Sequence, residues 1–328
     1  MRTPKRLSAA VLAAVAIAAA AVLAGCSSAS STAAATSAVA SASPTPPTSW
    51  IPHWPVTVTA TNGNVTITGL PQRIVSLDPT ATEDLYAVGA GSQVIAVDEA
   101  SNFPPGAPVT TLSGVKPNVA AIAAYHPSLV IAQNYPGLVA GLNKLGIPVL
   151  VEPEVTNLRD AYRQIQGIGL ATGHAHQSDE VVENMTQQID DTVADVGTKY
   201  RGMSYYWEQG VDPYHSATSA TLVGRIMDLF GLRDITDAAN APGSGPHPQL
   251  PASFIIAARP QLIFLADFGL VTGGQTPATV AARSGWAGIP AVKAHAVFGL
   301  NADLASRWGP RLPQLVGEIA NALETVKS

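Results

Sequence analysis

The chain has 328 residues, with 18 lysines and arginines against 23 aspartates and glutamates, which gives a formal net charge of −5. Charged residues make up only 12% of the chain and no basic patch stands out, so nucleic acid is not expected as a partner. The part that follows the first 50 residues is long enough for one large domain or two ordinary ones.

The first 26 residues are expected to be a secretory signal and not part of the fold. A positively charged start, MRTPKR, precedes the apolar run LSAAVLAAVAIAAAAVLAG. A membrane-spanning anchor is the alternative, because the run is nearly long enough to cross a bilayer. The ending LAGC resembles the bacterial lipobox, which implies that Cys26 is lipidated and anchors the protein at the outer face of the cell membrane. As the only cysteine, Cys26 forms no internal disulfide and needs another role.

Residues 27–50 are expected to be a disordered tether. They are rich in Ser, Ala, Thr and Pro and carry no charge. They contain too few large apolar side chains to pack a core. The folded part is therefore expected from residue 51 onward.

The first half of the folded part predicts a β-hairpin followed by a parallel α/β layer. The segment PVTVTATNGNVTITGL alternates apolar and polar residues around an Asn-Gly pair, which is a strong hairpin signal. Four continuous apolar strands then alternate with short helices: RIVSL, QVIAVD, SLVIAQ and IPVLVEP. This alternation indicates parallel strands covered by helices.

The second half repeats the same pattern after a pair of helices. The segment 159–199 predicts two helices, of which the second is longer and begins at Ser178 or Asp179. The strands MSYYWE, QLIFLAD and AVFGL follow, and a last helix starts near Pro310. AYHPSLVIA in the first half and AARPQLIFL in the second share a helix–proline–strand pattern. We therefore predict an α/β fold with an N-terminal lobe over 51–158, linking helices over 159–199 and a C-terminal lobe over 200–328.

Several segments in this order resemble the helical-backbone (class III) substrate-binding proteins of bacterial ABC importers. PQRIVSLDPTATEDLYAVGAGSQVIAV, VAAIAAYHPSLVIA and LNKLGIPVLV resemble the N-terminal lobe of that family, and GWAGIPAVKAHAVFGLNADLASRWGPRL resembles the end of its C-terminal lobe. The resemblance implies two parallel-sheet lobes bridged by one long rigid helix, with a ligand cleft between the lobes. It also implies a monomer that captures a ferric siderophore, haem or corrinoid without any reaction and delivers it to an ABC permease.

The segment ADLASRWGPR most resembles the corrinoid-binding branch of the family. There an acid and an arginine four residues later, followed by Gly/Ser-Pro-Arg, sit at the cleft; here they are Asp303 and Arg307. This implies cobalamin as the first choice of ligand, and a ferric siderophore or haem as the second.

This sequence also departs from the family pattern. Aromatic positions of the cobalamin cleft fall here on Ala100, Gly114, Gln133 and His247. The glutamates with which each lobe docks onto a permease fall on Ala120 and Ser253. The departures leave open a surface interaction module that kept the fold but lost transport, or docking through other acids such as Glu83 and Glu99.

The cleft of an open parallel sheet lies outside the carboxyl ends of its strands. Asp303, Arg307 and Trp308 lie between the AVFGL strand and the last helix, so they qualify as ligand contacts. An arginine at such a position presents planar donors to a carboxamide, phosphate or chelate oxygen. The alternative is structural: Asp303 and Arg307 pair to fix the loop, and Trp308 fills the start of the helix.

Other strand ends supply further candidate ligand contacts. Trp207 and Tyr214 lie in YYWEQGVDPYHSATS, and flat aromatic side chains suit a macrocycle or aryl chelate, although Trp207 could equally be a core residue. Asp78 and Tyr135 follow the first and third parallel strands, with a helix cap as the alternative for Asp78. His247 lies in the loop GSGPHPQL, where it could contact the ligand or coordinate the metal of a corrinoid or haem.

Catalysis and a resident metal ion or cofactor are not expected. No Ser/His/Asp or Cys/His group shows a recognisable spacing. The seven histidines are scattered, unlike the clustered histidines and acids of a zinc site. The expected cobalt or iron is part of a bound chelate and not a cofactor.

Overall fold

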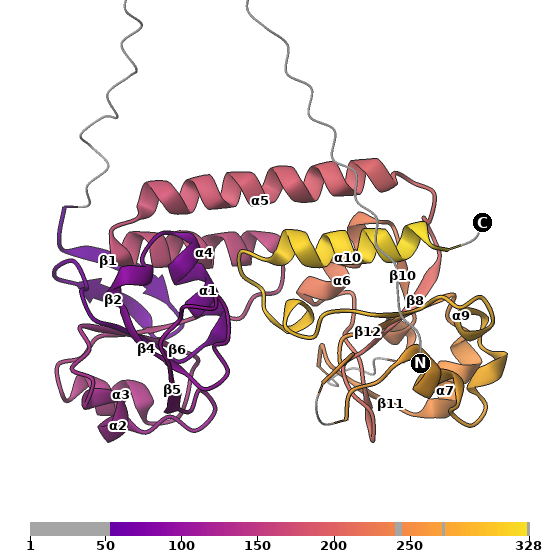
Figure 1. Ribbon diagram of the computed structural model, residues 1–328, viewed down its shortest axis with the longest axis horizontal. Helices are drawn as coiled ribbons and strands as arrows, with labels where there is room; N and C mark the ends of the chain where they lie inside the picture. The colour runs from indigo at the N-terminus through magenta and orange to yellow at the C-terminus, as the bar shows by residue number, and fades with distance from the viewer. Residues whose placement is uncertain (1–52, 240–244, 271–272, 327–328) are drawn as a thin grey trace, which may run out of the picture. The chain divides into compact units, whose positions relative to one another are not determined.

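The computed structural model describes residues 53–239, 245–270 and 273–326. The predicted signal segment with Cys26 and the predicted tether 27–50 lie outside these residues. The described residues form two α/β lobes, each built on its own parallel sheet, as predicted (Figure 1). No helix of this part of the chain combines the length and the apolar character that crossing a membrane requires.

The N-terminal lobe contains a five-stranded parallel sheet with the order β5-β4-β3-β6-β7. Its strands are β3 (Ile74–Ser76), β4 (Val94–Asp98), β5 (Val109–Leu112), β6 (Leu129–Ala132) and β7 (Val149–Val151). Its short helices are α1 (Pro79–Ala87), η2 (Gly91–Gln93), α2 (Val119–Ala123) and α3 (Leu138–Asn143). The edge strand β5 was not predicted, because only one of its four residues is buried and it lacks a continuous apolar run.

The C-terminal lobe contains a four-stranded parallel sheet with the order β10-β8-β12-β13. The strands are β8 (Ser204–Glu208), β10 (Arg233–Asp234), β12 (Leu262–Leu265) and β13 (Val297–Gly299), and a small ladder pairs β9 (Tyr214–His215) with β11 (Gln249–Leu250). Its helices are α6 (Leu222–Leu229), η3 (Thr236–Ala238), α7 (Ala252–Ala258), α8 (Pro277–Ala281), η4 (Trp286–Gly288), α9 (Pro290–Lys293), η5 (Leu304–Ser306) and α10 (Leu312–Glu324).

The two sheets share one strand order. The order β4-β3-β6-β7 in the first lobe corresponds to β10-β8-β12-β13 in the second. The repeated helix–proline–strand pattern also has the same backbone in both lobes. His126 and Arg259, each followed by a proline, adopt the left-handed conformation, with φ of 49° and 50°. The internal repeat in the sequence therefore reflects two lobes of the same architecture.

The N-terminal hairpin docks on the edge of the first sheet. Strands β1 (Val56–Ala60) and β2 (Gly63–Ile67) pair antiparallel, and their two-residue loop is Thr61–Asn62. The loop thus lies one residue earlier than the Asn-Gly pair predicted. The reason is that the Asn62 side chain bonds to β7: it donates to the Val149 carbonyl at 2.9 Å and accepts from the Val151 amide at 3.1 Å.

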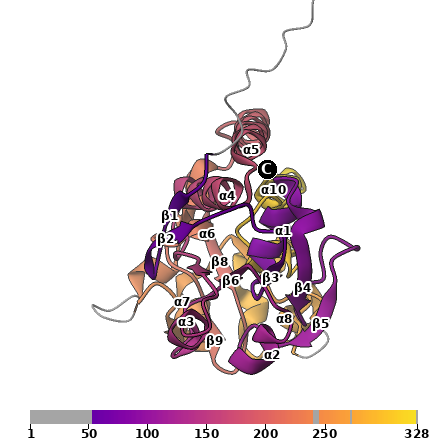
Figure 2. The ribbon, with the colours of Figure 1, turned by 90° about the vertical axis from the view of Figure 1, so that its left-hand side faces the viewer.

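Two helices connect the lobes. Helix α4 (Leu158–Thr172) ends at Gly173, and α5 (Ala175–Val196) packs on α4 and, farther along, on α10 of the second lobe (Figure 1). Figure 2 shows α5 lying outside both of these helices. Helix α5 begins before Ser178, which is buried in its first turn and donates to the Ala175 carbonyl at 2.7 Å. The long helix therefore bridges the lobes, as predicted.

The close approach of α4 and α5 depends on Gly169, since a Cβ there would lie closer than 3.0 Å to the Ser178 side chain. We expect Gly169→Ala to destabilise the protein because it pushes the two helices apart. Gly167→Ala in the same helix is the matched control, because its Cβ would meet only Val58 at an ordinary 3.5 Å. It should be neutral or stabilise by up to about 1 kcal/mol through helix propensity. Urea unfolding measures both, and equal effects of the two variants would contradict the prediction.

Candidate functional site

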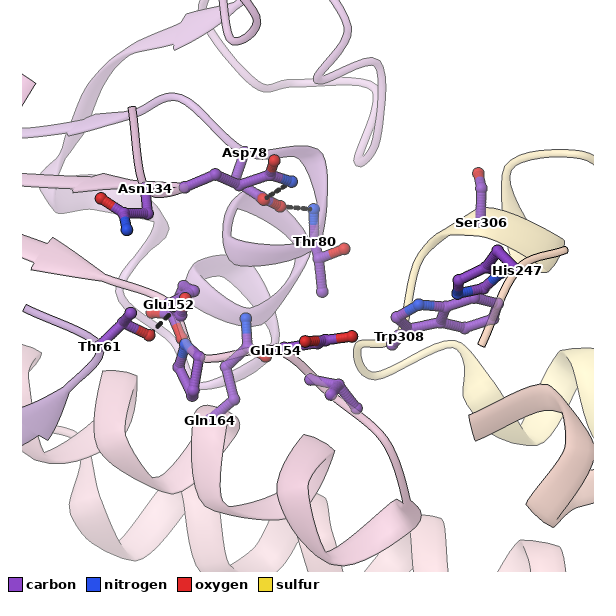
Figure 3. A pocket seen from close by; sticks show the side chains of 13 residues that line it. Thr61, Asp78, Thr80, Asn134, Glu152, Glu154, Gln164, His247, Ser306 and Trp308 are labelled. Carbon is purple, nitrogen blue, oxygen red and sulfur yellow. Dashed lines mark hydrogen bonds between the residues drawn. The ribbon is translucent and has the colours of Figure 1, made fainter. Parts of the chain in front are cut away.

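A cavity of about 460 Å³ lies between the lobes, at the carboxyl ends of the N-terminal strands (Figure 3). Residues of both lobes and of α4 line it, which confirms the predicted cleft. The lining residues are Thr61, Asp78, Thr80, Gln133, Asn134, Glu152, Pro153, Glu154, Val155, Gln164, His247, Ser306 and Trp308. The cavity thus brings together three of the predicted contacts: Asp78, His247 and Trp308.

The N-terminal wall of the cavity follows from the strand order. Asp78, Gln133 and Glu152 come just after β3, β6 and β7, which are neighbours in the sheet. The carboxyl ends of parallel strands lie at the same edge, so their polar side chains gather there. Sheet topology therefore assembles this wall from three separate parts of the sequence.

Asp78 fixes the wall and caps a helix at once. Its Oδ1 accepts from the Thr80 amide at 2.7 Å and the Ala81 amide at 3.2 Å, at the start of α1. Its Oδ2 accepts from Nε2 of Gln133 at 2.7 Å. The side chain is buried, yet it lines the cavity. The capping role and the cavity position are thus compatible.

Glu152, Glu154 and Gln164 complete the wall. Burial, followed by the charge of Asp78, raises the pKa of Glu152 well above its ordinary value, and Oε1 of Glu152 is buried without a hydrogen-bond partner. Gln164 on α4 is only 6% exposed, and its Oε1 also lacks a partner among the described residues. Glu154 is exposed and points across the cavity toward Trp308 (Figure 3). The wall therefore contains two buried acceptor atoms that no described residue satisfies.

The C-terminal wall consists of His247, Ser306 and Trp308 (Figure 3). Trp308 is half-buried and offers its indole to the cavity. The Nδ1 atom of His247 lies 3.0 Å from Oε1 of Gln209. Burial lowers the pKa of His247, an effect that Glu154 opposes. The imidazole is therefore held toward its neutral form, and this wall offers an aromatic face and hydrogen-bonding groups.

Asp303 and Arg307 lie outside the cavity lining and join the lobes. Arg307 is buried and donates to Oε1 of Glu83 at 3.1 Å and to Oδ1 of Asp303 at 2.8 Å. It also donates to the Asn102 side chain at 2.7 Å and the Ala100 carbonyl at 3.1 Å. Its guanidinium is thus occupied within the protein, which corresponds to the structural alternative considered for this pair.

A second arginine binds the same carboxylate. Arg311 donates from Nε to Oε2 of Glu83 at 2.8 Å and from Nη2 to Oε1, and its guanidinium lies 4.3 Å from the centre of the Phe103 ring. We refer to Glu83, Asn102, Asp303, Arg307 and Arg311 as the inter-lobe clasp. Because Glu83 is 2% exposed within the clasp, it cannot replace a docking glutamate on the surface; Glu99 is exposed.

A further buried acid lies beside the clasp. Asp84 is fully buried, and neither of its oxygens has a hydrogen-bond partner within the described part of the chain. Burial, followed by the charges of Glu152, Asp78 and Glu83, raises the pKa of Asp84 well above its ordinary value. Gly309 of the second lobe lies against it, since a Cβ there would come within 2.8 Å of Oδ1. The lobes therefore meet at a carboxyl group that is held toward its neutral form.

The remaining predicted contacts lie elsewhere. Trp207 has no exposed surface and packs near Phe264, because both faces of a strand inside a parallel sheet are covered. Trp207 is therefore a core residue and not the ligand contact that was predicted. Tyr214 lines a separate cavity of the C-terminal lobe and lies 5.4 Å from the Trp286 ring. Tyr135 packs on the N-terminal core, and burial followed by Asp78 and Asp98 raises its pKa.

The prediction missed several lining residues, among them Thr61, Glu152, Glu154 and Gln164. The signal for Glu152 was present, because it follows the IPVLV strand as Asp78 follows the first strand. Thr61 and Gln164 reach the cavity through the docking of the hairpin and of α4, which no local pattern indicates. Within the described ranges, no three or more His, Cys, Asp or Glu residues are grouped so as to hold a metal ion.

Comparison with known proteins identifies the family. The family model described as periplasmic binding protein matches residues 74–304. The chain belongs to this family. It is 29% identical over 280 residues to the uncharacterized ABC transporter substrate-binding lipoprotein YvrC of Bacillus subtilis, covering 82% of this chain and 86% of that protein. It is 28% identical over 262 residues to a vitamin B12-binding protein of Pectobacterium carotovorum, covering 77% and 89%.

Solved structures share the fold. The periplasmic vitamin B12-binding protein BtuF of Vibrio cholerae superposes with a TM-score of 0.63 at 24% identity, over 77% of this chain and 97% of that chain. An ABC-type Fe³⁺-hydroxamate transport protein of Saccharomonospora viridis superposes with a TM-score of 0.66 at 18% identity, over 83% and 99%. The two lobes with their bridging helix are therefore a fold that binding proteins for chemically different ligands share.

The clasp leads to a prediction about stability. Replacing Glu83 by Gln should lower the free energy of unfolding by about 3 kcal/mol, because it removes the carboxylate that Arg307 and Arg311 share, the only one that pairs with Arg311 among the described residues. The matched control is Glu183→Gln on the exposed face of α5, which removes the same charge. Urea unfolding followed by tryptophan fluorescence measures both variants. If Glu83→Gln and Glu183→Gln lower the free energy of unfolding by the same small amount, the clasp does not hold the lobes together.

Asp84 leads to a prediction about pH. Its pKa is raised in the folded state, so its contribution to stability is present below the unfolded pKa of about 3.9 and is lost as pH rises through the folded pKa. Asp84→Asn cannot ionise and should gain stability relative to the parent protein as pH increases from about 4 to 8. Asp195→Asn, at an exposed residue, is the control. Its difference in unfolding free energy from the parent protein should not change with pH. Measuring the free energies of unfolding across this pH range tests the prediction. A difference between Asp84→Asn and the parent protein that stays constant with pH would contradict it.

Proposed function

We propose that the protein is the extracytoplasmic substrate-binding component of an ABC importer and captures a metal chelate in the inter-lobe cavity. The observation that carries the proposal is that one cavity joins polar side chains at the N-terminal strand ends to Trp308 and His247 of the second lobe. A ligand held there contacts both lobes at once. The relatives named as a substrate-binding lipoprotein and as a vitamin B12-binding protein support this reading.

A corrinoid is the first choice of ligand, with a ferric siderophore or haem as the alternative. The B12-binding relative is 28% identical and covers most of both chains. Trp308 offers an aromatic face to a flat macrocycle. Asp78, Gln133, Asn134 and Gln164 offer polar groups to the amides that surround a corrin ring. Binding needs no reaction, so the protein acts by enclosure alone.

The connections between the lobes allow only small movements on binding. Helix α5 packs on α10 of the second lobe and on α4, which in turn packs on α1 and β1 of the first, and the clasp fixes the lobes on one side of the cavity. A preorganised site loses less entropy when a ligand binds. We infer that the ligand enters a cleft that is already largely formed, with the protein acting as a monomer.

The proposal includes a lipid anchor and a permease as partner. Cys26 after LAG would carry the lipid, and the uncharged segment 27–50 would tether the folded part to the outer face of the membrane. The relative named as a lipoprotein supports this arrangement. The docking positions expected from the family hold Ala120 on α2 and Ser253 on α7, both exposed. Docking there would rest on contacts other than carboxylate–arginine pairs.

Titration tests the ligand. Cobalamin should quench the intrinsic tryptophan fluorescence at micromolar concentration, and Trp308→Ala should weaken binding about tenfold or more through loss of an aromatic contact. The matched control is Phe268→Ala, which removes an exposed aromatic side chain that does not line the cavity. If a ferric hydroxamate or haem binds and cobalamin does not, that chelate replaces the corrinoid as the proposed ligand. If none of the three binds and the neighbouring permease's ATPase is not stimulated, the surface interaction module becomes the better explanation.

A further inference from the structure

The cavity between the lobes carries a one-sided set of charges. Three acids, Asp78, Glu152 and Glu154, are among its described lining residues, and no lysine or arginine is. Burial and the charge of Asp78 raise the pKa of Glu152 and hold it toward its uncharged form, so Glu152 adds little to the charge of the cavity. The segment 240–244 precedes His247 by a few residues and reads NAPGS, so its sequence contains no charged residue. His247, the one other ionisable group of the lining, is held toward its neutral form by burial, which lowers its pKa.

The nearest arginines of the second lobe do not offset this charge. Arg307 and Arg311 both bind the carboxylate of Glu83, and Arg307 also binds Asp303. Two cations thus face two anions within the clasp. Arg163 lines an adjoining cavity that shares Glu152 and Glu154, but it is paired there with Asp160 at 3.7 Å. The negative potential of the cavity therefore acts on a ligand that enters it.

Two buried acceptors in the same wall lack a donor. Gln164 is 6% exposed, lines the cavity and leaves its Oε1 without a partner, and Figure 3 shows its side chain rising from α4 into the cavity. Oε1 of Glu152 is likewise buried and unpartnered. A buried acceptor left unsatisfied costs free energy, and a ligand donor recovers it once the side chain rotates toward the cavity. Burial, followed by the charge of Asp78, raises the pKa of Glu152, and a cationic ligand nearby would lower it again.

The opposite side of the cavity suits a cation as well. Glu154 points toward Trp308 (Figure 3), so a carboxylate and an indole face lie across from one another. A cation between them gains both a charge–charge attraction and a cation–π contact. A chelate with carboxylate or catecholate groups at its periphery would instead be repelled by the acids of the N-terminal wall. On the C-terminal wall it would find no basic side chain among the described lining residues.

We propose that this cavity selects chelates that carry a positive charge and N–H donors at their periphery, and that it rejects chelates of net negative charge. The inference rests on the proposed function and narrows its ligand class. It favours ferric hydroxamates that bear a free amine and corrinoids whose cobalt complex is cationic. It disfavours haem, with its two propionates, and ferric catecholates.

Two matched pairs of probes test the charge selection. Ferric desferrioxamine B carries one ammonium group, and its N-acetylated form is the same chelate without that charge. Aquacobalamin and cyanocobalamin differ in the same way, by one positive charge at the cobalt. Within whichever pair binds, the cationic member should bind about tenfold or more tightly at low salt, and the ratio should shrink as salt is added. Isothermal titration or fluorescence quenching measures both members.

Variants connect the selection to the cavity. Glu154→Gln, at an exposed side chain, should reduce the charge ratio several-fold. Glu152→Gln should reduce it less, because burial and Asp78 raise the pKa of Glu152 and hold it toward its uncharged form. Glu183→Gln on α5 removes the same charge far from the cavity lining and should leave the ratio unchanged. An equal reduction by the control would mean that only the net charge of the protein matters, which would overturn the assignment to this cavity.

The outcomes separate the two proposals. Equal or tighter binding of the neutral member of a pair would overturn the charge inference and leave the proposed function intact. Binding of haem or a ferric catecholate, with neither pair bound, would do the same. If none of these chelates binds to protein that circular dichroism shows to be folded, the proposed function fails, and the charge inference fails with it.

Discussion

One buried carboxylate determines how the two lobes of this protein meet. Glu83 projects from the first helix of the N-terminal lobe and receives both Arg307 and Arg311 of the C-terminal lobe. Isolated burial of such a charge is costly, and its cost is offset only when the partners keep good geometry. The ion pairs therefore favour one relative position of the lobes. The cavity beside them depends on that position, because its two walls belong to different lobes.

The same helix serves both the clasp and the cavity. Asp78 caps α1 and lines the cavity, while Glu83 and Asp84 meet the second lobe farther along the helix. A shift of α1 would move the cap, the clasp and the wall together. This coupling explains why so many acids stand close to one another in a protein with few charged residues. Glu83 and Asp303, which contact arginines, hold the lobes together, whereas the exposed Glu154 remains available to a ligand in the cavity.

The sequence allowed the architecture to be predicted better than the site. The alternation of apolar strands and helices, and the repeated segment before Pro127 and Pro260, identify two similar lobes because these patterns are local. Asp78 was found because it directly follows a strand. Arg307 was assigned to the ligand because its partner Glu83 is more than two hundred residues away and no local signal reveals the pair. Trp207 was misplaced because burial on both faces of a strand depends on the helices that cover the sheet.

The cavity also draws residues from segments that flank the region matched by the family model. The family match spans residues 74–304, whereas Thr61 comes from the hairpin before it, and Ser306 and Trp308 come from the loop after it. Both arginines of the clasp lie after it too. The matched region thus supplies the sheets, the acidic strand ends, Gln164 and His247, and the flanking segments supply Thr61, Ser306 and Trp308. Ligand preference can therefore diverge within such a family through changes at the two ends of the fold, where neither sheet has to be rebuilt.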